Sequence, residues 1–229
     1  MNSRVVRAAG VSLIGGAIAF MAVFAYLAAK FNYPDVLDGS AATVLPALLA
    51  TGSQGRAAWA LYALLPLIFI PAGVGAFHAL RQTSEGSMRV AMHFATLAAL
   101  SMMLGLMRWP SIHWELAKAY VVAAPDQRAV FDAVFLGLNR YLGNYIGEFL
   151  GELSFSIFFL LSAMAMLRER RWIGYLGVVT AVAGMVGMFR NVTSAVGFVA
   201  DVNNYLLPAW MIVFGVSLLR GPYAARGTQ

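Results

Sequence analysis

Residues 8–29 read AAGVSLIGGAIAFMAVFAYLAA and contain no charged side chain. A helix needs about 20 mainly apolar residues to cross the hydrocarbon core of a bilayer, so this stretch is long enough to span a membrane. Arg4 and Arg7 precede it, as they would in a signal peptide, but the run is longer than the roughly 7 to 15 residues of a signal-peptide core. We therefore interpret residues 8–29 as a retained transmembrane helix.

Five further apolar runs follow the first, and Lys or Arg lies at the ends of the runs. Together the six runs cover residues 8–29, 57–80, 90–107, 148–167, 172–189 and 202–219. Hydrophobic residues make up 61% of the 229-residue chain and charged residues only 11%, well below the roughly 25% of a soluble domain. The sequence therefore predicts an all-α polytopic membrane bundle with six transmembrane helices, forming a single domain over residues 1–229.

Lys and Arg are unevenly divided between the two sides that six helices create. One side holds nine of them, Arg226 included, against two acids, and the other side holds seven against eight acids. Because cytoplasmic loops are enriched in Lys and Arg, this division predicts cytoplasmic N- and C-termini in a bacterial inner membrane. The net charge of +6 thus reflects membrane topology, and nucleic acid is not an expected partner. The absence of cysteine excludes disulfides, thiolate catalysis and thiolate metal sites.

The first and third loops, both on the outer side, predict short helices of their own. In the first loop Ser40 precedes an apolar stretch that ends at Leu49, a pattern typical of an interfacial helix. In the third loop, residues 109–139, Pro125 separates two short helical segments, with Asp126 expected in the first turn of the second. We expect that second helix to run directly into the fourth span.

Charged residues recur at one depth in the outer half of spans three to six. Counting about 1.5 Å of helix rise per residue from the cytoplasmic Arg residues places this layer about 29 Å from the cytoplasmic end, with Glu152 roughly 6 Å deeper in the membrane. Polar residues also recur every four positions from Arg140 to Glu152, which forms a polar stripe on one helix face. The sequence therefore predicts an outward-facing polar pocket. Its candidate ligand-binding residues are Arg108, Arg140, Asn144, Glu148, Glu152, Arg190, Asp201 and Asn204.

Two roles are open for this layer. In one, Glu152 is a proton acceptor or ligand anchor and an Arg engages an anionic group, because ionisable residues inside a membrane usually mark function. In the other, the Arg–acid pairs simply hold helices together. Our leading hypothesis is a non-enzymatic protein that binds a small or lipid-like ligand, or a partner subunit. The alternative is a membrane-embedded enzyme or proton-coupled carrier that uses Glu152.

His78 and His93 flank the turn expected between the second and third spans. An antiparallel hairpin would place both imidazoles at similar depth, where they could ligate a b-type haem in an electron-transfer subunit. Hydrogen bonding to neighbours is the simpler role, because no carboxylate or third His completes a metal shell on those spans. We therefore predict no metal site and no resident cofactor, with haem b as the alternative. No nucleophile-elbow, zincin, P-loop or dinucleotide motif lies where its chemistry requires, so no enzymatic activity is assigned.

Several segments resemble a bacterial family of multi-pass membrane proteins that is catalogued only as a domain of unknown function. They are Phe31-Asn32-Tyr33-Pro34-Asp35-Val36-Leu37, the region of Trp59, Arg108-Trp109, and Tyr141-Leu142-Gly143 with Gly147-Glu148 and Leu150-Gly151. The similarity runs through most of the chain. The resemblance implies a six-helix inner-membrane protein surrounded by membrane lipid, and it supplies no catalytic or binding residues.

Overall fold

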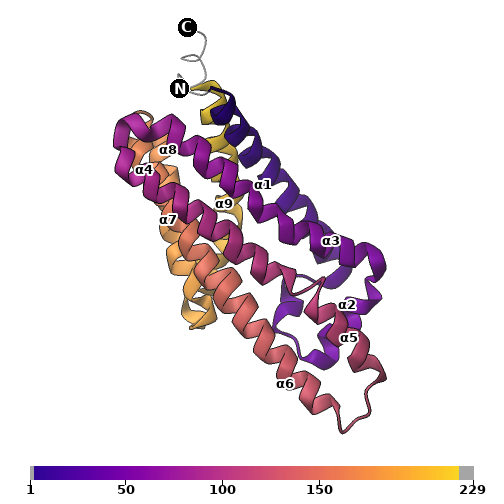
Figure 1. Ribbon diagram of the computed structural model, residues 1–229. Helices are drawn as coiled ribbons and strands as arrows, with labels where there is room; N and C mark the ends of the chain where they lie inside the picture. Colours follow the sequence, from indigo (N-terminus) through magenta and orange to yellow (C-terminus); the bar gives the residue numbers. More distant parts are fainter. Residues whose placement is uncertain (1–2, 222–229) are drawn as a thin grey trace.

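The computed structural model describes residues 3–221, and every regular element in this part of the chain is a helix. By length and composition, five helical segments of the described residues could cross a membrane: Ser3–Phe31, Gly52–Val122, Arg128–Leu167, Arg171–Asn191 and Ser194–Arg220. They associate in one elongated bundle (Figure 1). The predicted all-helical class is confirmed, and these helices have the length and composition of an integral membrane protein.

The second of these segments, Gly52–Val122, is folded back on itself. It consists of α3 (Gly52–Leu64), the 3₁₀ helix η2 (Leu65–Ile68), α4 (Phe69–Met107) and α5 (Ile112–Val122). Within α4 the backbone leaves helical geometry at Ser84, and the chain reverses direction there (Figure 1). Gly73 on the first arm then packs against the second arm, where a Cβ on Gly73 would lie 2.6 Å from the Cβ of Ala95. The second and third predicted apolar runs occupy these two antiparallel arms.

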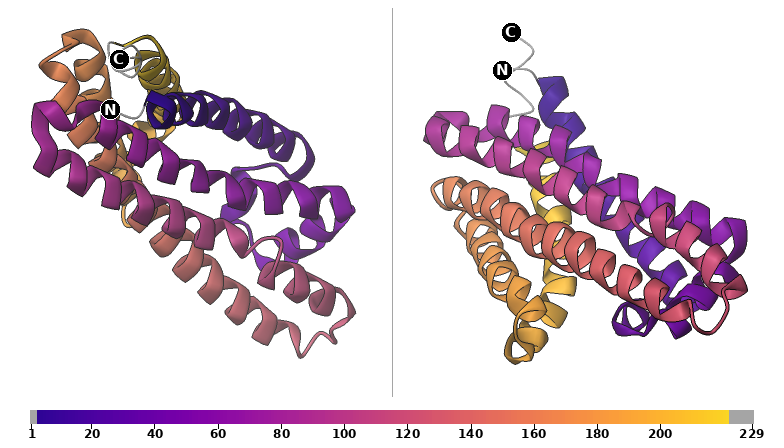
Figure 2. Two further views of the ribbon diagram at one scale, coloured as in Figure 1. Left: turned by 45° about the horizontal axis from the view of Figure 1, so that its top comes forward. Right: turned by 60° about the horizontal axis from the view of Figure 1, so that its bottom comes forward.

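The third segment is a continuous helix of 40 residues that changes its winding along its length. It consists of α6 (Arg128–Leu138), the π-helix η3 (Asn139–Leu150) and α7 (Gly151–Leu167). At about 1.5 Å per residue such a helix is close to 60 Å long, roughly twice the thickness of a bilayer's hydrocarbon core. It lies beside the second arm of α4 and extends beyond it (Figure 2). As expected from the sequence, α6 runs into α7 without a break in the helix.

Close contacts between small residues also join the remaining helices of the bundle. The helices are α1 (Ser3–Phe31), α8 (Arg171–Gly187), which continues as the 3₁₀ helix η4 (Met188–Asn191), and α9 (Gly197–Arg220), which follows η5 (Ser194–Val196). A Cβ on Gly10 of α1 would lie 2.8 Å from the carbonyl oxygen of Gly215 on α9. Such small-residue contacts let helix backbones approach closely, which is the usual way that helices associate within membranes.

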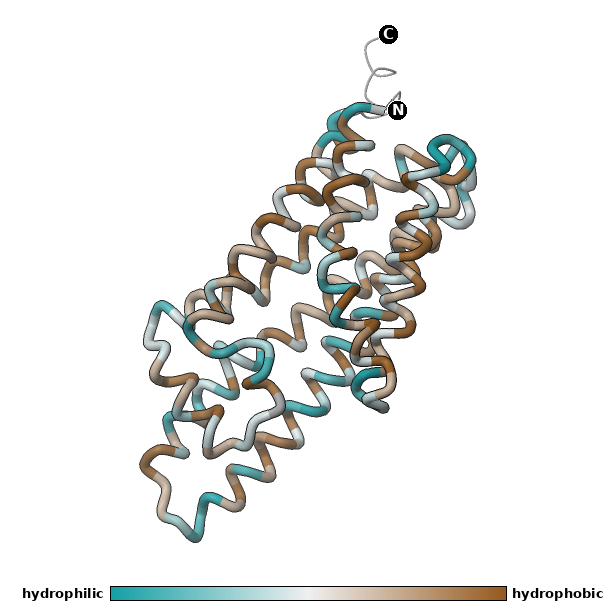
Figure 3. The backbone as a smooth tube through the Cα atoms, turned by 180° about the vertical axis from the view of Figure 1, so that it is seen from behind, coloured by the Kyte–Doolittle hydropathy of each residue, from teal (hydrophilic) through white to brown (hydrophobic). Residues whose placement is uncertain are grey.

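Polar turns gather at the end of the bundle where α1 begins and α9 ends (Figures 1 and 3). Thr83, beside the reversal in α4, donates from Oγ1 to Oε1 of Glu169 in the turn between α7 and α8 at 2.8 Å. Arg168 in the same turn donates from Nη1 to the carbonyl oxygen of Thr83 at 3.2 Å. The two turns therefore lie next to each other at one end of the molecule.

The opposite end holds the short helices. They are η1 (Asp35–Asp38), α2 (Ala41–Ala50), α5 and α6 (Figure 1). Ser40 directly precedes α2, but its side chain makes no capping hydrogen bond, and Asp126 lies before α6 rather than in its first turn. An aromatic core holds these helices against α1 and α3, and the stacked rings of Trp59 and Trp109, 4.9 Å apart, lie within it.

Candidate functional site

Arg190 binds two carboxylates at once. Its Nη1 and Nη2 donate to Oε2 and Oε1 of Glu152 at 2.8 and 2.5 Å, and Nη2 also donates to Oε2 of Glu148 at 3.1 Å. Asn191 donates from Nδ2 to the same Glu148 oxygen at 3.1 Å and to the carbonyl oxygen of Asn144 at 3.2 Å. We call Asn144, Glu148, Glu152, Arg190 and Asn191 the carboxylate cluster. Its two-pronged Arg–carboxylate pair is among the stronger hydrogen-bonding arrangements in proteins.

Three elements of the fold supply this cluster. Asn144 and Glu148 lie on the π-helix η3, and Glu152 follows in the first turn of α7. Arg190 and Asn191 lie on η4, the 3₁₀ helix at the end of α8. π-Helices are rare, and where they occur they are frequently found at functional sites. The predicted polar stripe therefore coincides with the π-helical part of the 40-residue helix.

The carboxylate cluster is partly exposed. The side chains of Arg190, Glu148 and Glu152 keep 31%, 26% and 23% of their accessible surface. One guanidinium faces two carboxylates, so these three groups carry an excess negative charge. Among the described residues, Oε1 of Glu148 has no hydrogen-bond partner. The cluster can therefore still accept a hydrogen bond from outside itself.

The phenol of Tyr33 lies within electrostatic range of Glu148 and Arg190. It lies between α1 and η1, and its ring centroid is 5.1 Å from that of Phe24 and 6.0 Å from that of Tyr62. Burial raises the pKa of Tyr33 above its ordinary value, and the negative charge of Glu148 raises this pKa further. The phenol therefore stays protonated at neutral pH. The sequence prediction missed this residue, although it lies within the segment 31–37 that carries the family resemblance.

Arg108 is separate from the carboxylate pairs. It is only 4% exposed, and its Nε donates to Oδ1 of Asn139 at 3.1 Å while its Nη1 donates to the carbonyl oxygen of Gly105. Asn139 in turn donates from Nδ2 to the carbonyl oxygen of Leu37 at 3.1 Å. The guanidinium lies directly against Gly143, where a Cβ would come within 2.4 Å of Nη2. In the described part of the chain, no carboxylate lies within ion-pair distance of Arg108.

The remaining predicted ligand-binding residues point elsewhere. Arg140, Asp201 and Asn204 are exposed, and the described structure gives their side chains no hydrogen bond or ion pair. The structure thus brings together Asn144, through its backbone, with Glu148, Glu152 and Arg190. Asn191 is the residue that the list of candidates omitted. Its place directly after Arg190 was the available signal.

His78 and His93 lie on the two arms of α4. His78 is half-buried and its Nδ1 has no hydrogen-bond partner among the described residues, whereas His93 is exposed. No group of three or more His, Cys, Asp or Glu side chains in residues 3–221 is arranged to hold a metal ion. Haem ligation by this pair stays a prediction, and the visible absorption spectrum of the purified protein is its direct test.

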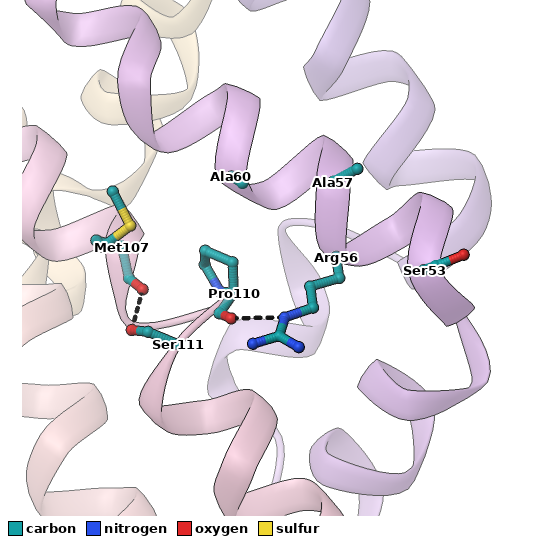
Figure 4. A pocket seen from close by; sticks show the side chains of 7 residues that line it. All are labelled: Ser53, Arg56, Ala57, Ala60, Met107, Pro110 and Ser111. Atoms are coloured by element: carbon teal, nitrogen blue, oxygen red, sulfur yellow. Dashed lines mark hydrogen bonds between the residues drawn. The ribbon is translucent and has the colours of Figure 1, made fainter.

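A shallow groove of about 450 Å³ lies apart from the carboxylate cluster, between α3 and the link that joins α4 to α5. It is lined by Ser53, Arg56, Ala57, Ala60, Met107, Pro110 and Ser111 (Figure 4). Arg56 reaches across the groove and donates from Nε to the carbonyl oxygen of Pro110 at 3.0 Å. A second groove of about 460 Å³ lies between α1 and α3 and has a mainly apolar lining.

Comparison with known proteins adds one match. A family model described as Domain of unknown function (DUF4386) matches residues 8–220, which is nearly the whole chain. No curated protein and no solved structure matches the chain.

Proposed function

Because this chain belongs to the DUF4386 family, whose description assigns no activity, we propose a function from the geometry of the carboxylate cluster. The protein is a six-span protein of a bacterial inner membrane, and it uses the cluster to bind a small or lipid-like ligand that carries an ammonium group. One observation carries the proposal: a single guanidinium is shared by two carboxylates that are each about a quarter exposed.

Six crossings follow when the folded segment Gly52–Val122 is counted as two. The reversal at Ser84 and the turn between α7 and α8 lie at the end where α1 begins and α9 ends (Figure 1). The side with the larger number of Lys and Arg residues corresponds to this end of the bundle. This excess favours a cytoplasmic location for the end where α1 begins and α9 ends. Arg226, part of that excess, lies outside the described residues. The short helices α2, α5 and α6 then lie at the outer interface, and α6 extends beyond it.

Charge balance favours a cationic ligand. An excess negative charge in a low-dielectric environment is stabilised by a positive group. Arg190 already uses both terminal nitrogens on Glu152 and Glu148, so the guanidinium has little capacity left for an anionic group. This modifies the expectation from sequence, in which an Arg engaged an anion. The available Oε1 of Glu148 is instead a suitable acceptor for a primary ammonium.

Depth favours a lipid-like molecule. Glu148 is twenty residues from Arg168, which places it about 30 Å from the cytoplasmic end at the rise of an α-helix, near the outer headgroups. Glu152 lies one turn deeper. A headgroup bound to Glu148 would therefore leave its acyl chains beside apolar helix surfaces. Phosphatidylethanolamine combines an ammonium headgroup with two such chains.

Lipid retention tests this proposal. Purified protein is exposed to equal amounts of phosphatidylethanolamine and phosphatidylglycerol, and bound lipid is counted by native mass spectrometry. The wild-type protein is expected to prefer phosphatidylethanolamine by about tenfold, which corresponds to about 1.4 kcal/mol. Glu148→Gln is expected to remove most of this preference. Glu115→Gln is the matched control, because Glu115 is an exposed carboxylate on α5 that pairs with Arg56 and Lys118.

Two outcomes would contradict the proposal. Equal retention of the two lipids by the wild-type protein would show that the cluster does not select an ammonium group. A preference that Glu148→Gln leaves unchanged, in a variant that melts like the wild type, would place lipid selection elsewhere on the surface.

Proton coupling is the second candidate function, and the depth of Glu152 favours it. This carboxylate lies further inside the membrane than Glu148 and shares a guanidinium with it. Adjacent carboxylates in one site are a common arrangement for binding a proton. Proton flux into proteoliposomes carrying a pH-sensitive dye tests this role. Flux that Glu152→Gln abolishes and Glu152→Asp preserves would support coupling, whereas the same flux in Glu152→Gln and wild type would rule it out.

A further inference from the structure

A second polar group lies inside the aromatic core at the outer end of the bundle, and it surrounds the ring of Trp109. The ring of Trp59 stacks on Trp109 with centroids 4.9 Å apart, and the ring of His113 meets it edge to face at 4.8 Å. The Cζ atom of Arg108 lies 5.0 Å from the centroid of the Trp109 ring. We call Trp59, Arg108, Trp109 and His113 the aromatic donor cluster.

These four side chains are buried, and most of their polar atoms are unpaired. Trp59, Trp109 and His113 are 0% exposed and Arg108 is 4% exposed. Neither indole Nε1 and neither ring nitrogen of His113 has a hydrogen-bond partner among the described residues. An indole N–H can only donate, and a neutral imidazole carries at least one N–H. Unpaired buried donors are rare in native proteins, and a bound water or ion is one arrangement that satisfies them.

The charge of Arg108 is also unbalanced at contact distance. Its hydrogen bonds go to two neutral oxygens, those of Asn139 and Gly105. Glu148 is the carboxylate whose field reaches Arg108, but its Oε2 is already bound by Arg190 and Asn191. A buried charge is unfavourable unless an opposite charge or several hydrogen bonds compensate it. The cluster therefore combines a buried cation with an excess of donors.

We propose that the aromatic donor cluster binds a small inorganic anion of halide size, with chloride as the physiological example. The guanidinium of Arg108 supplies the charge, and the N–H groups of the indoles and of His113 supply hydrogen bonds. The positively polarised edges of aromatic rings add further attraction for an anion. The near-complete burial of the four side chains favours a monatomic ion over a phosphate or an organic acid. This site does not depend on the proposed function of the carboxylate cluster.

The groove shown in Figure 4 is lined partly by residues that lie next to this cluster in the chain. Pro110 and Ser111, which follow Trp109 in the chain, line the groove, and Arg56 lies at its rim with 44% of its side chain exposed. Arg56 and Lys118 both pair with Glu115, so these three side chains carry a net positive charge, which raises the local concentration of anions.

Anion-dependent stability tests the proposal. The thermal unfolding midpoint of the full chain in detergent is measured in sodium chloride and in sodium gluconate at equal ionic strength. Chloride is expected to raise the midpoint by about 3 to 5 °C, because a ligand that binds only the folded state stabilises it. A structure determined from crystals grown in bromide is expected to show an anomalous peak at the Arg108 guanidinium.

Variants separate a specific site from a general salt effect. Arg108→Gln is expected to remove the difference between chloride and gluconate, and Trp59→Phe and His113→Phe, which each delete N–H donors, are expected to reduce it. Trp210→Phe is the matched control. Trp210 is also 0% exposed with an unpaired Nε1, but it lies in the other hydrophobic core, among residues such as Phe159 and Phe214. It should retain the full chloride effect.

Three results would overturn the proposal. The first is an equal midpoint for the wild-type protein in chloride and gluconate. The second is a chloride effect that Trp59→Phe and His113→Phe leave intact, and these two variants keep the test open if Arg108→Gln does not fold. The third is a bromide-grown structure in which water alone contacts the Arg108 guanidinium.

Discussion

Gly105 on the second arm of α4 and Gly147 on the π-helix meet backbone to backbone. A Cβ on Gly105 would lie 2.4 Å from the Cα of Gly147, and a Cβ on Gly147 would lie 2.9 Å from the Cα of Gly105. Neither position can carry a side chain without moving one backbone away from the other. Because Glu148 follows Gly147 directly, this contact positions the carboxylate cluster relative to the rest of the bundle.

The first prediction is that Gly147→Ala destabilises the protein and weakens ligand binding at the cluster. We expect a loss of about 1 to 3 kcal/mol, because the added methyl group overpacks a backbone contact. Thermal unfolding in detergent measures it. Gly137→Ala is the control on the same 40-residue helix, since a Cβ there would meet nothing within 4 Å. An equal effect of the two substitutions would show that the contact does not matter.

A second prediction couples Gly143 to Arg108. Gly143→Ala in the wild-type background should be destabilising, because the new Cβ would lie 2.4 Å from Nη2 of Arg108. In an Arg108→Ala background the same substitution should be close to neutral, because the guanidinium is gone. We expect an interaction energy of about 1 to 2 kcal/mol in this double-mutant cycle. Additive effects of the two substitutions would contradict the packing described for Arg108.

The third prediction concerns Arg190. Arg190→Gln leaves Glu148 and Glu152 facing each other without a cation, whereas Glu148→Gln leaves one Arg–carboxylate pair intact. Arg190→Gln should therefore be the more destabilising change, by about 1 to 2 kcal/mol given the partial exposure of the groups. Unfolding midpoints of the two variants measure the difference. A larger loss for Glu148→Gln would mean that repulsion between the carboxylates is unimportant.

A fourth prediction tests the topology. The chain has no cysteine, so a single introduced cysteine is a unique label. Gly86→Cys lies beside the reversal in α4 and Ala124→Cys lies between α5 and α6, and both positions are exposed. A membrane-impermeant maleimide should label Ala124→Cys in intact spheroplasts and should label Gly86→Cys only after permeabilisation. Labelling of both positions in intact spheroplasts would contradict six crossings with a cytoplasmic reversal.

Local composition was enough to predict the all-helical class. Apolar runs bounded by Arg identified the long helices, and Pro125 correctly indicated a break between α5 and α6. Boundaries were less accurate, because polar residues can extend a helix beyond its apolar part. The first run was predicted as residues 8–29, yet α1 spans Ser3–Phe31 and includes charged residues at both ends.

The candidate site was only partly predictable, because pairing depends on tertiary contacts. Spacing alone placed Glu148 and Glu152 on one face, and the structure places both against Arg190. Nothing in the local sequence indicated the π-helix, or that Arg108 would bind the amide of Asn139 rather than a carboxylate. Equal depth in the bundle did not determine which face of its helix each charged residue would occupy, so Arg140 and Asp201 proved to be exposed.

The most direct test of the account is a structure of the protein in a bilayer containing phosphatidylethanolamine, with attention to the outer half of η3 and α7. We expect density for a headgroup within hydrogen-bond distance of the Glu148 carboxylate, with its acyl chains along the neighbouring helices. The account would be contradicted if Glu148, Glu152 and Arg190 contacted only one another and water, with no ordered ligand beside them.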